Sequence, residues 1–265
     1  MKNNNTDIFI SGGGLAGMIA SIAFSKKGFS VVCVDKNNID FYTKNQNENF
    51  RTTAFLEPSK IFLDEIGIWE FLENYSCPMN SLKIVDTKTS NDKLKIKTEK
   101  TFSNDNYSVP LGWNIKNSDM LNALYKIFIK EKKIRFYPDT YINDFETYSN
   151  FVQLQLSNGK QYKSKLLIGC DGRNSFVRKK LKIKTINKDL KQNALTFGIK
   201  HEFKHNKISN EIYNSGGPFT TVPLRIDEGE NISSVVWMDN LDKAEKLNNL
   251  SKNNFEKEVI DRSAN

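Results

Sequence analysis

Cysteine and histidine are scarce in this chain, which has three cysteines and two histidines among its 265 residues. Cys33, Cys77 and Cys170 are too few and too far apart for the disulfide framework of a small secreted domain, so we expect free thiols and a cytoplasmic location. His201 and His205 have no cysteine or carboxylate neighbour at a metal-ligand spacing. The sequence therefore predicts no metal site.

Long apolar runs are missing as well. No segment has the roughly 20 apolar residues that a membrane-spanning helix needs, so we expect any contact with a membrane to be peripheral. The apolar stretch from Ile8 to Phe24 has some features of a secretory signal, but it contains four glycines and leads directly into a second apolar strand. A signal peptide does not explain those glycines, whereas a strand-turn-helix unit does.

Basic residues are in excess, with 39 lysines and arginines against 31 acidic residues and a net charge of +8. A single-strand nucleic-acid binder interleaves such residues with aromatic side chains, and no basic run of this chain does so. Many of the lysines stand beside asparagines, which is typical of turns and solvated surfaces. We therefore predict no nucleic-acid partner, and the length is sufficient for two globular domains.

The first part of the chain has the pattern of a β-α-β unit. An apolar strand at residues 7–11 precedes a helix at residues 15–27, which Gly28 ends, and a second apolar strand follows at residues 30–34. Continuous apolar strands of this kind are typical of a parallel sheet that is covered on both faces. The sequence therefore predicts that the chain begins with a Rossmann-type unit.

The turn of this unit has the glycine spacing of a dinucleotide site. Gly12 permits the tight turn, Gly14 lets a diphosphate approach the backbone, and Gly17 lets the helix pack close to the sheet. The amides at the N-terminus of the helix then face the phosphates. Asp35 ends the second strand, 18 residues after Gly17. A carboxylate at that place accepts a hydrogen bond from a ribose hydroxyl and disfavours the extra phosphate of NADP, so FAD and NAD both fit the turn.

A second cluster, Gly169-Cys170-Asp171-Gly172, ends another apolar strand far downstream. A β-α-β unit that is followed by an apolar strand ending in Asp-Gly favours FAD over NAD as the ligand. Asp171 has an alternative role as the cap of a helix predicted at residues 175–182, because aspartate is a good capping residue. The two roles are compatible.

With these motifs the chain resembles the flavin-dependent aromatic hydroxylases of the para-hydroxybenzoate hydroxylase class, above all the branch that hydroxylates ubiquinone precursors. The resemblance implies an α/β fold in which a Rossmann-type FAD-binding domain with a parallel sheet is interleaved with an antiparallel β-sheet substrate domain. The matching segments extend over nearly the whole chain: residues 12–17 with Asp35, 51–54 followed by 63–69, 115–117, 169–178, and 217–218 with 223–224.

The resemblance also implies a division of the chain. The FAD-binding domain is expected at residues 1–76 and 113–185, and the substrate domain at residues 77–112 and 186–265. The family has a third FAD motif, a Gly-Asp pair before a helix, and no such motif occurs after Arg178. We therefore expect the substrate domain to be incomplete at its C-terminus and the chain to be a truncated version of the family.

Residue roles follow from the same resemblance. The arginine at the position of Arg51 reaches the FAD pyrophosphate, for which a forked guanidinium is suited, although an arginine that packs over the following helix is the alternative. In the family, the residue at the position of Asp171 contacts the ribityl and pyrophosphate region of FAD. It also contacts the nicotinamide cofactor while that cofactor is transiently bound. The predicted cofactor-binding residues are Gly12, Gly14, Leu15, Ala16, Gly17, Asp35, Arg51, Asp171 and Gly172.

The implied activity is a monooxygenase reaction, in which NAD(P)H reduces FAD and one atom of O₂ is transferred to an aromatic ring, here that of a ubiquinone precursor. Because the cofactor supplies this chemistry, no catalytic side chain is predicted. Such a substrate implies peripheral association with the inner face of a membrane or with a biosynthetic complex. Two alternatives stay open: a non-catalytic flavin-binding remnant or scaffold subunit, and a flavin-dependent reductase of the same fold.

Overall fold

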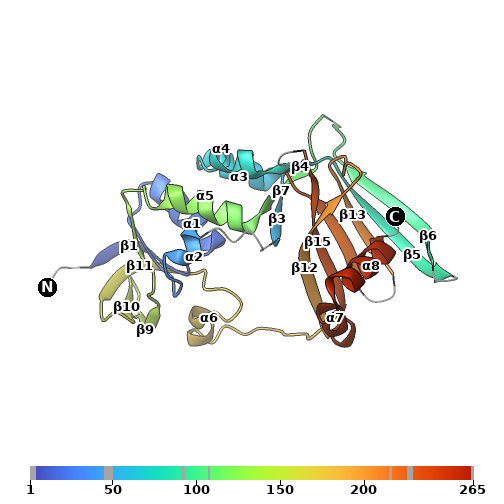
Figure 1. The fold of residues 1–265 in the computed structure, drawn as a ribbon. Helices are drawn as coiled ribbons and strands as arrows, with labels where there is room; N and C mark the ends of the chain where they lie inside the picture. Colours follow the sequence, from blue (N-terminus) through green and yellow to red (C-terminus); the bar gives the residue numbers. More distant parts are fainter. Residues whose placement is uncertain are drawn as a thin grey trace. The chain divides into compact units, whose positions relative to one another are not determined.

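The structure of the protein is a computed structural model, which describes residues 4–44, 50–90, 93–106, 108–214, 217–225 and 229–263. The chain forms two compact units, and in each of them segments from distant parts of the sequence come together (Figure 1). The first unit comprises Met1–Asn45, Phe62–Leu72 and Ser118–Ile186, and the second comprises Gln46–Ile61, Glu73–Asn117 and Asn187–Asn265.

The first unit is built on a six-stranded sheet in the order β8-β2-β1-β11-β10-β9. The strands from β8 to β11 run parallel to one another, while β10 pairs antiparallel with both β11 and β9. The strands are β1 (Asn5–Ser11), β2 (Val31–Val34), β8 (Ile134–Tyr137), β9 (Ile142–Thr147), β10 (Val152–Leu156) and β11 (Gln161–Gly169).

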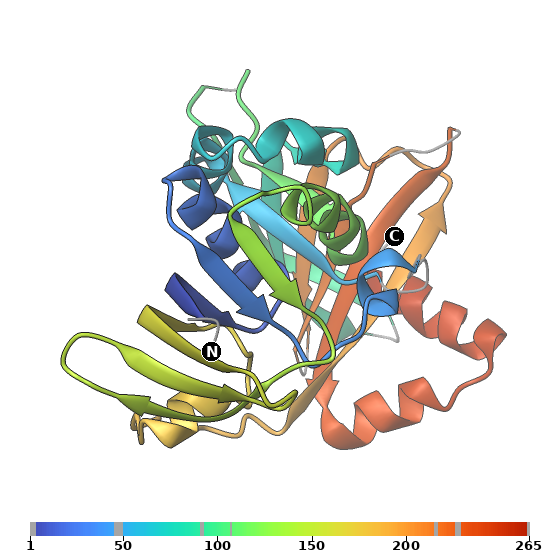
Figure 2. The ribbon, with the colours of Figure 1, turned by 90° about the vertical axis from the view of Figure 1, so that its left-hand side faces the viewer.

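Helices cover the parallel part of this sheet because its strands are apolar on both faces. The helix α1 (Leu15–Lys26) contacts β1, β2 and β8, and the helix α5 (Asn117–Phe128) packs its Phe128 ring against Phe136 of β8. Both helices lie over the same face of the sheet (Figure 2). On the other face, Phe9 joins a buried cluster with Val177 of the short helix α6 (Phe176–Lys180).

One of these strands is longer than its apolar run. The apolar strand that ends at the Gly169 cluster is the second half of β11, which begins at Gln161. Its first half pairs antiparallel with β10, and it pairs parallel with β1 from Lys163 to Gly169. Alternating and continuous apolar patterns therefore belong to one strand, because only its second half lies in the parallel part of the sheet.

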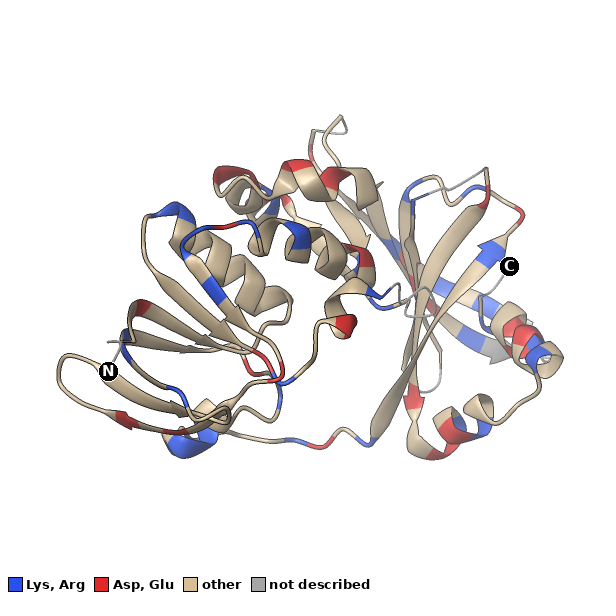
Figure 3. Ribbon diagram, turned by 60° about the vertical axis from the view of Figure 1, so that its left-hand side comes forward, with Lys and Arg blue, Asp and Glu red and all other residues tan. Residues whose placement is uncertain are grey.

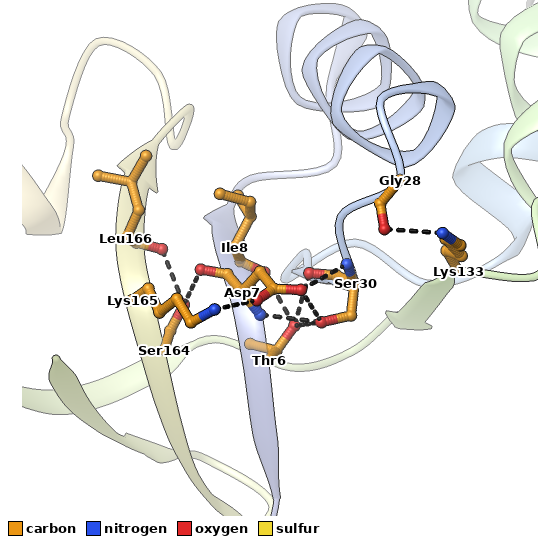
Figure 4. A network of polar contacts seen from close by, with 9 residues as sticks. All are labelled: Thr6, Asp7, Ile8, Gly28, Ser30, Lys133, Ser164, Lys165 and Leu166. Atoms are coloured by element: carbon orange, nitrogen blue, oxygen red, sulfur yellow. Dashed lines mark hydrogen bonds and ion pairs between the residues drawn. The ribbon is translucent and has the colours of Figure 1, made fainter.

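Asp7 ties the beginning of β1 to its two neighbouring strands (Figure 4). Its Oδ2 accepts hydrogen bonds from the Ser30 backbone N at 2.9 Å and the Ser30 hydroxyl at 2.7 Å, ahead of β2. Its Oδ1 lies 2.8 Å from Nζ of Lys165 on β11. The Lys165 ammonium, and then the bonds from Ser30, hold the pKa of the Asp7 carboxyl well below its usual range.

We expect the variant Asp7→Asn to lose about 1 kcal/mol of unfolding free energy at pH 7, since Lys165 is exposed and the pair is screened by water. A lowered pKa in the folded state stabilises the fold above the unfolded pKa of about 4, and this contribution decreases below that pH until it is lost as the pH falls through the folded-state pKa. Urea unfolding at pH 7 and pH 3 measures the difference. A deficit of equal size at both pH values would contradict the assignment, and Asp105→Asn, at an exposed site, is the control.

The second unit contains a six-stranded sheet and a three-stranded one. The larger has the order β12-β15-β14-β13-β5-β6, and its strands are antiparallel except for the parallel pair β13 and β5. Its strands are β5 (Ser81–Ser90), β6 (Lys93–Ser103), β12 (Gln192–His201), β13 (Ile208–Tyr213), β14 (Pro218–Pro223) and β15 (Asn231–Asn240).

The smaller sheet consists of β3 (Thr52–Leu56), β7 (Gly112–Lys116) and β4 (Cys77–Met79), with β7 in the middle. Two helices, α7 (Leu241–Asn248) and α8 (Lys252–Ser263), pack on the larger sheet through Leu247 and Val259, which join the core around Trp237. The remaining elements are α2 (Asp40–Thr43), α3 (Glu57–Glu65), α4 (Trp69–Leu72) and a 3₁₀ turn, η1 (Glu73–Tyr75).

The two units differ from the expected domain division at its edges. Residues 50–61, 73–76 and 113–117 were assigned to the first domain, and their contacts group them with the second unit, whereas Ile186 groups with the first. The reason is that β3 pairs along its whole length with β7, which in turn pairs with β4. Short-range sequence patterns do not reveal such a long-range pairing.

Charged residues occur in both units, with lysines and arginines interspersed among acidic residues on α7 and α8 (Figure 3). The helix α6 carries Arg178, Lys179 and Lys180 in its last turn and no acidic residue. Within the described ranges, no helix is both long and apolar enough to cross a membrane.

Candidate functional site

The glycine-rich turn after β1 packs directly against the end of β11. Gly12 has a φ of 102°, and a Cβ built on it would lie 2.3 Å from the carbonyl oxygen of Cys170 and 2.8 Å from the backbone N of Asp171. The Cys170 backbone N also donates to the Ser11 carbonyl at 2.7 Å. The two glycine clusters that are far apart in the sequence therefore meet in space.

Gly17 closes the turn from the helix side. A Cβ at Gly17 would lie 1.8 Å from the carbonyl oxygen of Gly12, which leaves room only for hydrogen. Gly12 and Gly17 are thus required for the backbone to pass this point, as the spacing predicted.

Gly14 differs from these two glycines because the space around it is open. A Cβ there would meet no described atom within 4 Å, and its φ of −68° suits any residue. Gly14 is the N-cap of α1 and offers no capping side chain, Ala16 is exposed, and the first turn carries no acidic residue. The first amides of α1 therefore point to a place where an anion, such as a diphosphate, is favoured.

Asp35 lies at the end of β2 and holds the turn. Its Oδ2 accepts from the Gly13 backbone N at 2.5 Å, its Oδ1 accepts from the Asn37 backbone N at 2.7 Å, and the residue is buried. A carboxylate has about four lone-pair sites, so these two bonds leave capacity for a ribose hydroxyl. The predicted ligand contact is compatible with a structural role that the sequence did not reveal.

Tyr42 of α2 is a neighbour of the turn that sequence reasoning missed. Its hydroxyl would lie 3.0 Å from a Cβ on Gly13, and its ring stacks on Tyr125 with centroids 5.2 Å apart. Burial, and then the nearby Asp35 carboxylate, raises the pKa of the Tyr42 hydroxyl far above its usual value. The Tyr42 hydroxyl therefore stays protonated, and the residue packs against the glycine turn as an uncharged group. The polar stretch that contains Tyr42 has no periodic pattern that could have predicted this contact.

Asp171 accepts from the first amides of α6, as its alternative role implied, but the N-cap residue of this helix is Ser175, whose hydroxyl accepts from the Arg178 backbone N at 3.0 Å. The Asp171 Oδ2 accepts from the backbone N of Phe176 at 2.7 Å and of Val177 at 3.2 Å, at the start of α6. Its Oδ1 is buried and has no hydrogen-bond partner among the described residues. Gly172 is exposed beside it, with a φ of 80°. An unsatisfied buried carboxylate oxygen beside the glycine turn is consistent with a hydroxyl donor on a ligand.

The cysteines near this site are free. Cys33 on β2 is completely buried, and burial raises the pKa of its thiol far above the usual value. Burial, followed by the Asp171 carboxylate, also raises the pKa of the half-buried Cys170. Both thiols therefore stay protonated and act as small apolar groups rather than nucleophiles.

Arg51 lies in the second unit, immediately before β3, and its side chain is exposed. Its carbonyl oxygen accepts from the Asn117 backbone N at 2.8 Å, which fixes the backbone at this position. An exposed guanidinium on a fixed backbone is suited to binding a phosphate group.

The arrangement in the first unit fits a nucleotide diphosphate. It combines an open helix N-terminus, a glycine that leaves space for a ligand, and an aspartate after each of the two strands, β2 and β11, that flank β1. Residues 5–262 match the family described as the FAD binding domain. The chain belongs to this family. The FAD-binding fold and cofactor class that the sequence predicted are thereby confirmed.

Two relatives of this FAD-binding chain are hydroxylases of ubiquinone or a ubiquinol by name. The chain is 25% identical over 253 residues to the ubiquinone hydroxylase UbiL of Rhodospirillum rubrum, covering 96% of this chain and 56% of that protein. It is 22% identical over 261 residues to the 3-demethoxyubiquinol 3-hydroxylase of Escherichia coli, covering 98% and 64%. The chain thus spans less than two thirds of the length of each of these relatives.

The fold is also that of a solved structure, PqsL of Pseudomonas aeruginosa, described as a probable FAD-dependent monooxygenase. The TM-score is 0.73 at 15% identity, over 92% of this chain and 63% of that one. At this identity the likeness concerns the fold alone. It confirms the predicted architecture, in which a Rossmann-type unit is interleaved with a β-sheet unit, and the resemblance to ubiquinone hydroxylases is confirmed by the two relatives.

Proposed function

We propose that this FAD-binding chain acts as an FAD-dependent monooxygenase, which hydroxylates the aromatic ring of a ubiquinone precursor with NAD(P)H and O₂ as co-substrates. The observation that carries the proposal is the meeting of the Gly12 turn with the Cys170-Asp171 backbone. Family membership and the named ubiquinone hydroxylases among its relatives support the same assignment.

The glycine turn of the first unit would bind the diphosphate of FAD. The amides of Gly14, Leu15 and Ala16 would donate to it at the start of α1, with Gly12 and Gly17 allowing the approach. Asp35 would accept from a ribose hydroxyl, and Asp171 with Gly172 from the ribityl chain. The family resemblance gives Arg51 the role of binding the pyrophosphate with its guanidinium, and we retain this role as a proposal.

Bound FAD supplies the electron transfer and oxygen chemistry of such a reaction. The chain's own tasks are to bind the cofactor, to orient it and to keep water away from it. Asp35 and Asp171 would bind and orient the cofactor as fixed hydrogen-bond acceptors, because backbone N–H groups hold both carboxylates in place. We assign no proton transfer to a side chain.

We also infer that the protein works at a membrane surface, because a ubiquinone precursor carries an apolar tail. After α6 the chain exposes Leu181, Ile183 and Ile186 between lysines, and Ile186 is fully exposed. Exposed apolar side chains next to lysines suit the surface of an anionic bilayer. Cosedimentation with phosphatidylglycerol vesicles at low and high salt would test this inference.

The proposed function is tested by titrating the purified chain with FAD and following the quenching of flavin fluorescence. We expect stoichiometric binding and a yellow protein. Oxygen uptake with NADH or NADPH, coupled to hydroxylation of a soluble ubiquinone-precursor analogue, then tests the activity. Flavin reduction without hydroxylation would favour a reductase, and a colourless protein that ignores added FAD would favour a remnant or scaffold; both results would contradict the proposal.

A further inference from the structure

Gly13, the middle glycine of the nucleotide turn, lies against three groups from other segments of the first unit. A Cβ built on it would lie 3.0 Å from the Tyr42 hydroxyl, 3.1 Å from the Asp35 Cβ and 3.1 Å from Cε2 of Phe136. Contacts of this length are uncommon for a real Cβ, so a methyl group at position 13 would displace at least one of these groups. The Tyr42 hydroxyl and the Asp35 side chain therefore border the same small space under the turn.

The Tyr42 ring is held in place by its aromatic neighbours. It is 1% exposed, it stacks on Tyr125 of α5, and it meets Phe136 of β8 edge to face with ring centroids 5.5 Å apart. The helix α2, which carries Tyr42, has only four residues, and so short a helix is not stable by itself. The aromatic contacts therefore determine where the Tyr42 hydroxyl lies.

The Tyr42 hydroxyl can donate a hydrogen bond to the Asp35 carboxylate. Burial, and then this carboxylate, raises the pKa of the hydroxyl far above its usual value, so the hydroxyl keeps its proton. It has no other hydrogen-bond partner among the described residues. Because a buried donor without a partner is costly, the hydroxyl is favoured to donate to Asp35.

The Asp35 carboxylate also accepts from two backbone amides. The bond from Asn37 is local to the same loop, whereas the bond from Gly13, at 2.5 Å, comes from the nucleotide turn. The second bond keeps its geometry only while Gly13 stays where the aromatic groups support it. Tyr42 therefore acts on the carboxylate in two ways, by supporting Gly13 and by donating to Asp35.

We propose that Tyr42 is a positioning residue, which orients the Asp35 carboxylate and thereby sets the preference of the site for a ribose with a free 2′-hydroxyl. This inference rests on the proposed function, in which Asp35 accepts from a ribose hydroxyl of FAD. A carboxylate that three donors already orient loses less freedom when it binds the ligand, so affinity for the hydroxyl is higher. A purely structural alternative is that Tyr42 only attaches α2 to the unit.

Two ligands separate these roles: FAD, and FAD that lacks the 2′-hydroxyl of its adenosine ribose. We expect the wild type to prefer FAD by about tenfold or more, as for a hydrogen bond to a charged group. Tyr42→Phe keeps the ring and removes only the hydroxyl, and we expect it to reduce this preference to about threefold or less. An unchanged preference would overturn the proposal, even if both ligands bound more weakly.

Tyr125→Phe is the matched control, because it removes the same group from the other ring of the stacked pair. Every atom of Tyr125 lies farther from the Cβ position of Gly13 than the Tyr42 hydroxyl does. We expect this variant to keep the wild-type preference, and a loss as large as that of Tyr42→Phe would count against the Tyr42 hydroxyl. If Tyr42→Phe does not fold, Gly13→Ala replaces it, since its methyl group displaces the hydroxyl or the Asp35 side chain.

Hydrogen exchange of the Gly13 amide, followed by NMR, examines the same contact without FAD. We expect faster exchange in Tyr42→Phe than in the wild type and Tyr125→Phe, because the bond to Asp35 opens more often. If the wild-type chain binds no FAD, the proposed function fails, and this inference fails with it. If the chain binds FAD but shows no preference for the 2′-hydroxyl, or if Tyr42→Phe changes neither the preference nor the exchange, the positioning role alone fails.

Discussion

Replacing Gly14 by alanine is expected to weaken FAD binding by about a hundredfold, or about 2.7 kcal/mol, while the fold keeps nearly all its stability. The reason is that Gly14 faces open space: a Cβ there meets no described atom within 4 Å, and its φ of −68° is ordinary. The only cost to the protein is a poorer N-cap on α1, about 1 kcal/mol or less. The new methyl group would occupy the place where the diphosphate approaches the helix.

Fluorescence titration with FAD and urea unfolding of the FAD-free protein measure the two effects separately. Lys27→Ala, at the exposed C-terminal end of the same helix, serves as a control that leaves the turn unchanged. If Gly14→Ala bound FAD as tightly as the wild type, the diphosphate could not lie against this turn, and the proposed site would be wrong.

Gly17→Ala is expected to act in the opposite way, by destabilising the first unit by about 3 kcal/mol. Alanine in a helix normally stabilises it by about 1 kcal/mol relative to glycine. Here the added Cβ would lie 1.8 Å from the Gly12 carbonyl oxygen, so α1 or the turn must move. The clash is with backbone, which cannot rotate away as a side chain can.

Thermal unfolding followed by circular dichroism measures this loss, which we expect to lower the melting temperature by about 10 °C. Gly14→Ala provides the matched comparison, because it adds the same methyl group three residues earlier in the same turn. An unchanged or higher melting temperature for Gly17→Ala would show that the turn does not have the close packing described above.

The parts of the fold that the sequence predicted are those that local patterns encode. The strand, turn and helix from β1 to β2 were expected within one or two residues of where they lie, because their apolar runs and glycines are contiguous. The small sheet of β3, β4 and β7 was not expected. Its strands are short and come from three distant segments, and only their mutual pairing makes them strands.

A similar reason explains why β13 was missed. It pairs parallel with β5, whose residues lie more than a hundred positions earlier, and its sequence, Ile-Ser-Asn-Glu-Ile-Tyr, has an alternation too short to be read alone. The helix α7 also went unpredicted, although Asn240 caps it by accepting from the Lys243 backbone N at 2.9 Å. Asparagine before a run containing leucine and alanine was the available signal.

By itself, the sequence determined the residues of the nucleotide turn, since Gly12, Gly14 and Gly17 follow from the local geometry of a strand entering a helix. Only the tertiary structure decided that Gly12 packs on the Cys170 carbonyl, that Asp35 and Asp171 are engaged by backbone amides, and that Tyr42 lies against Gly13. Spacing along the chain encodes backbone conformation over a few residues. Contacts between distant segments depend on how whole sheets pack, which no short pattern contains.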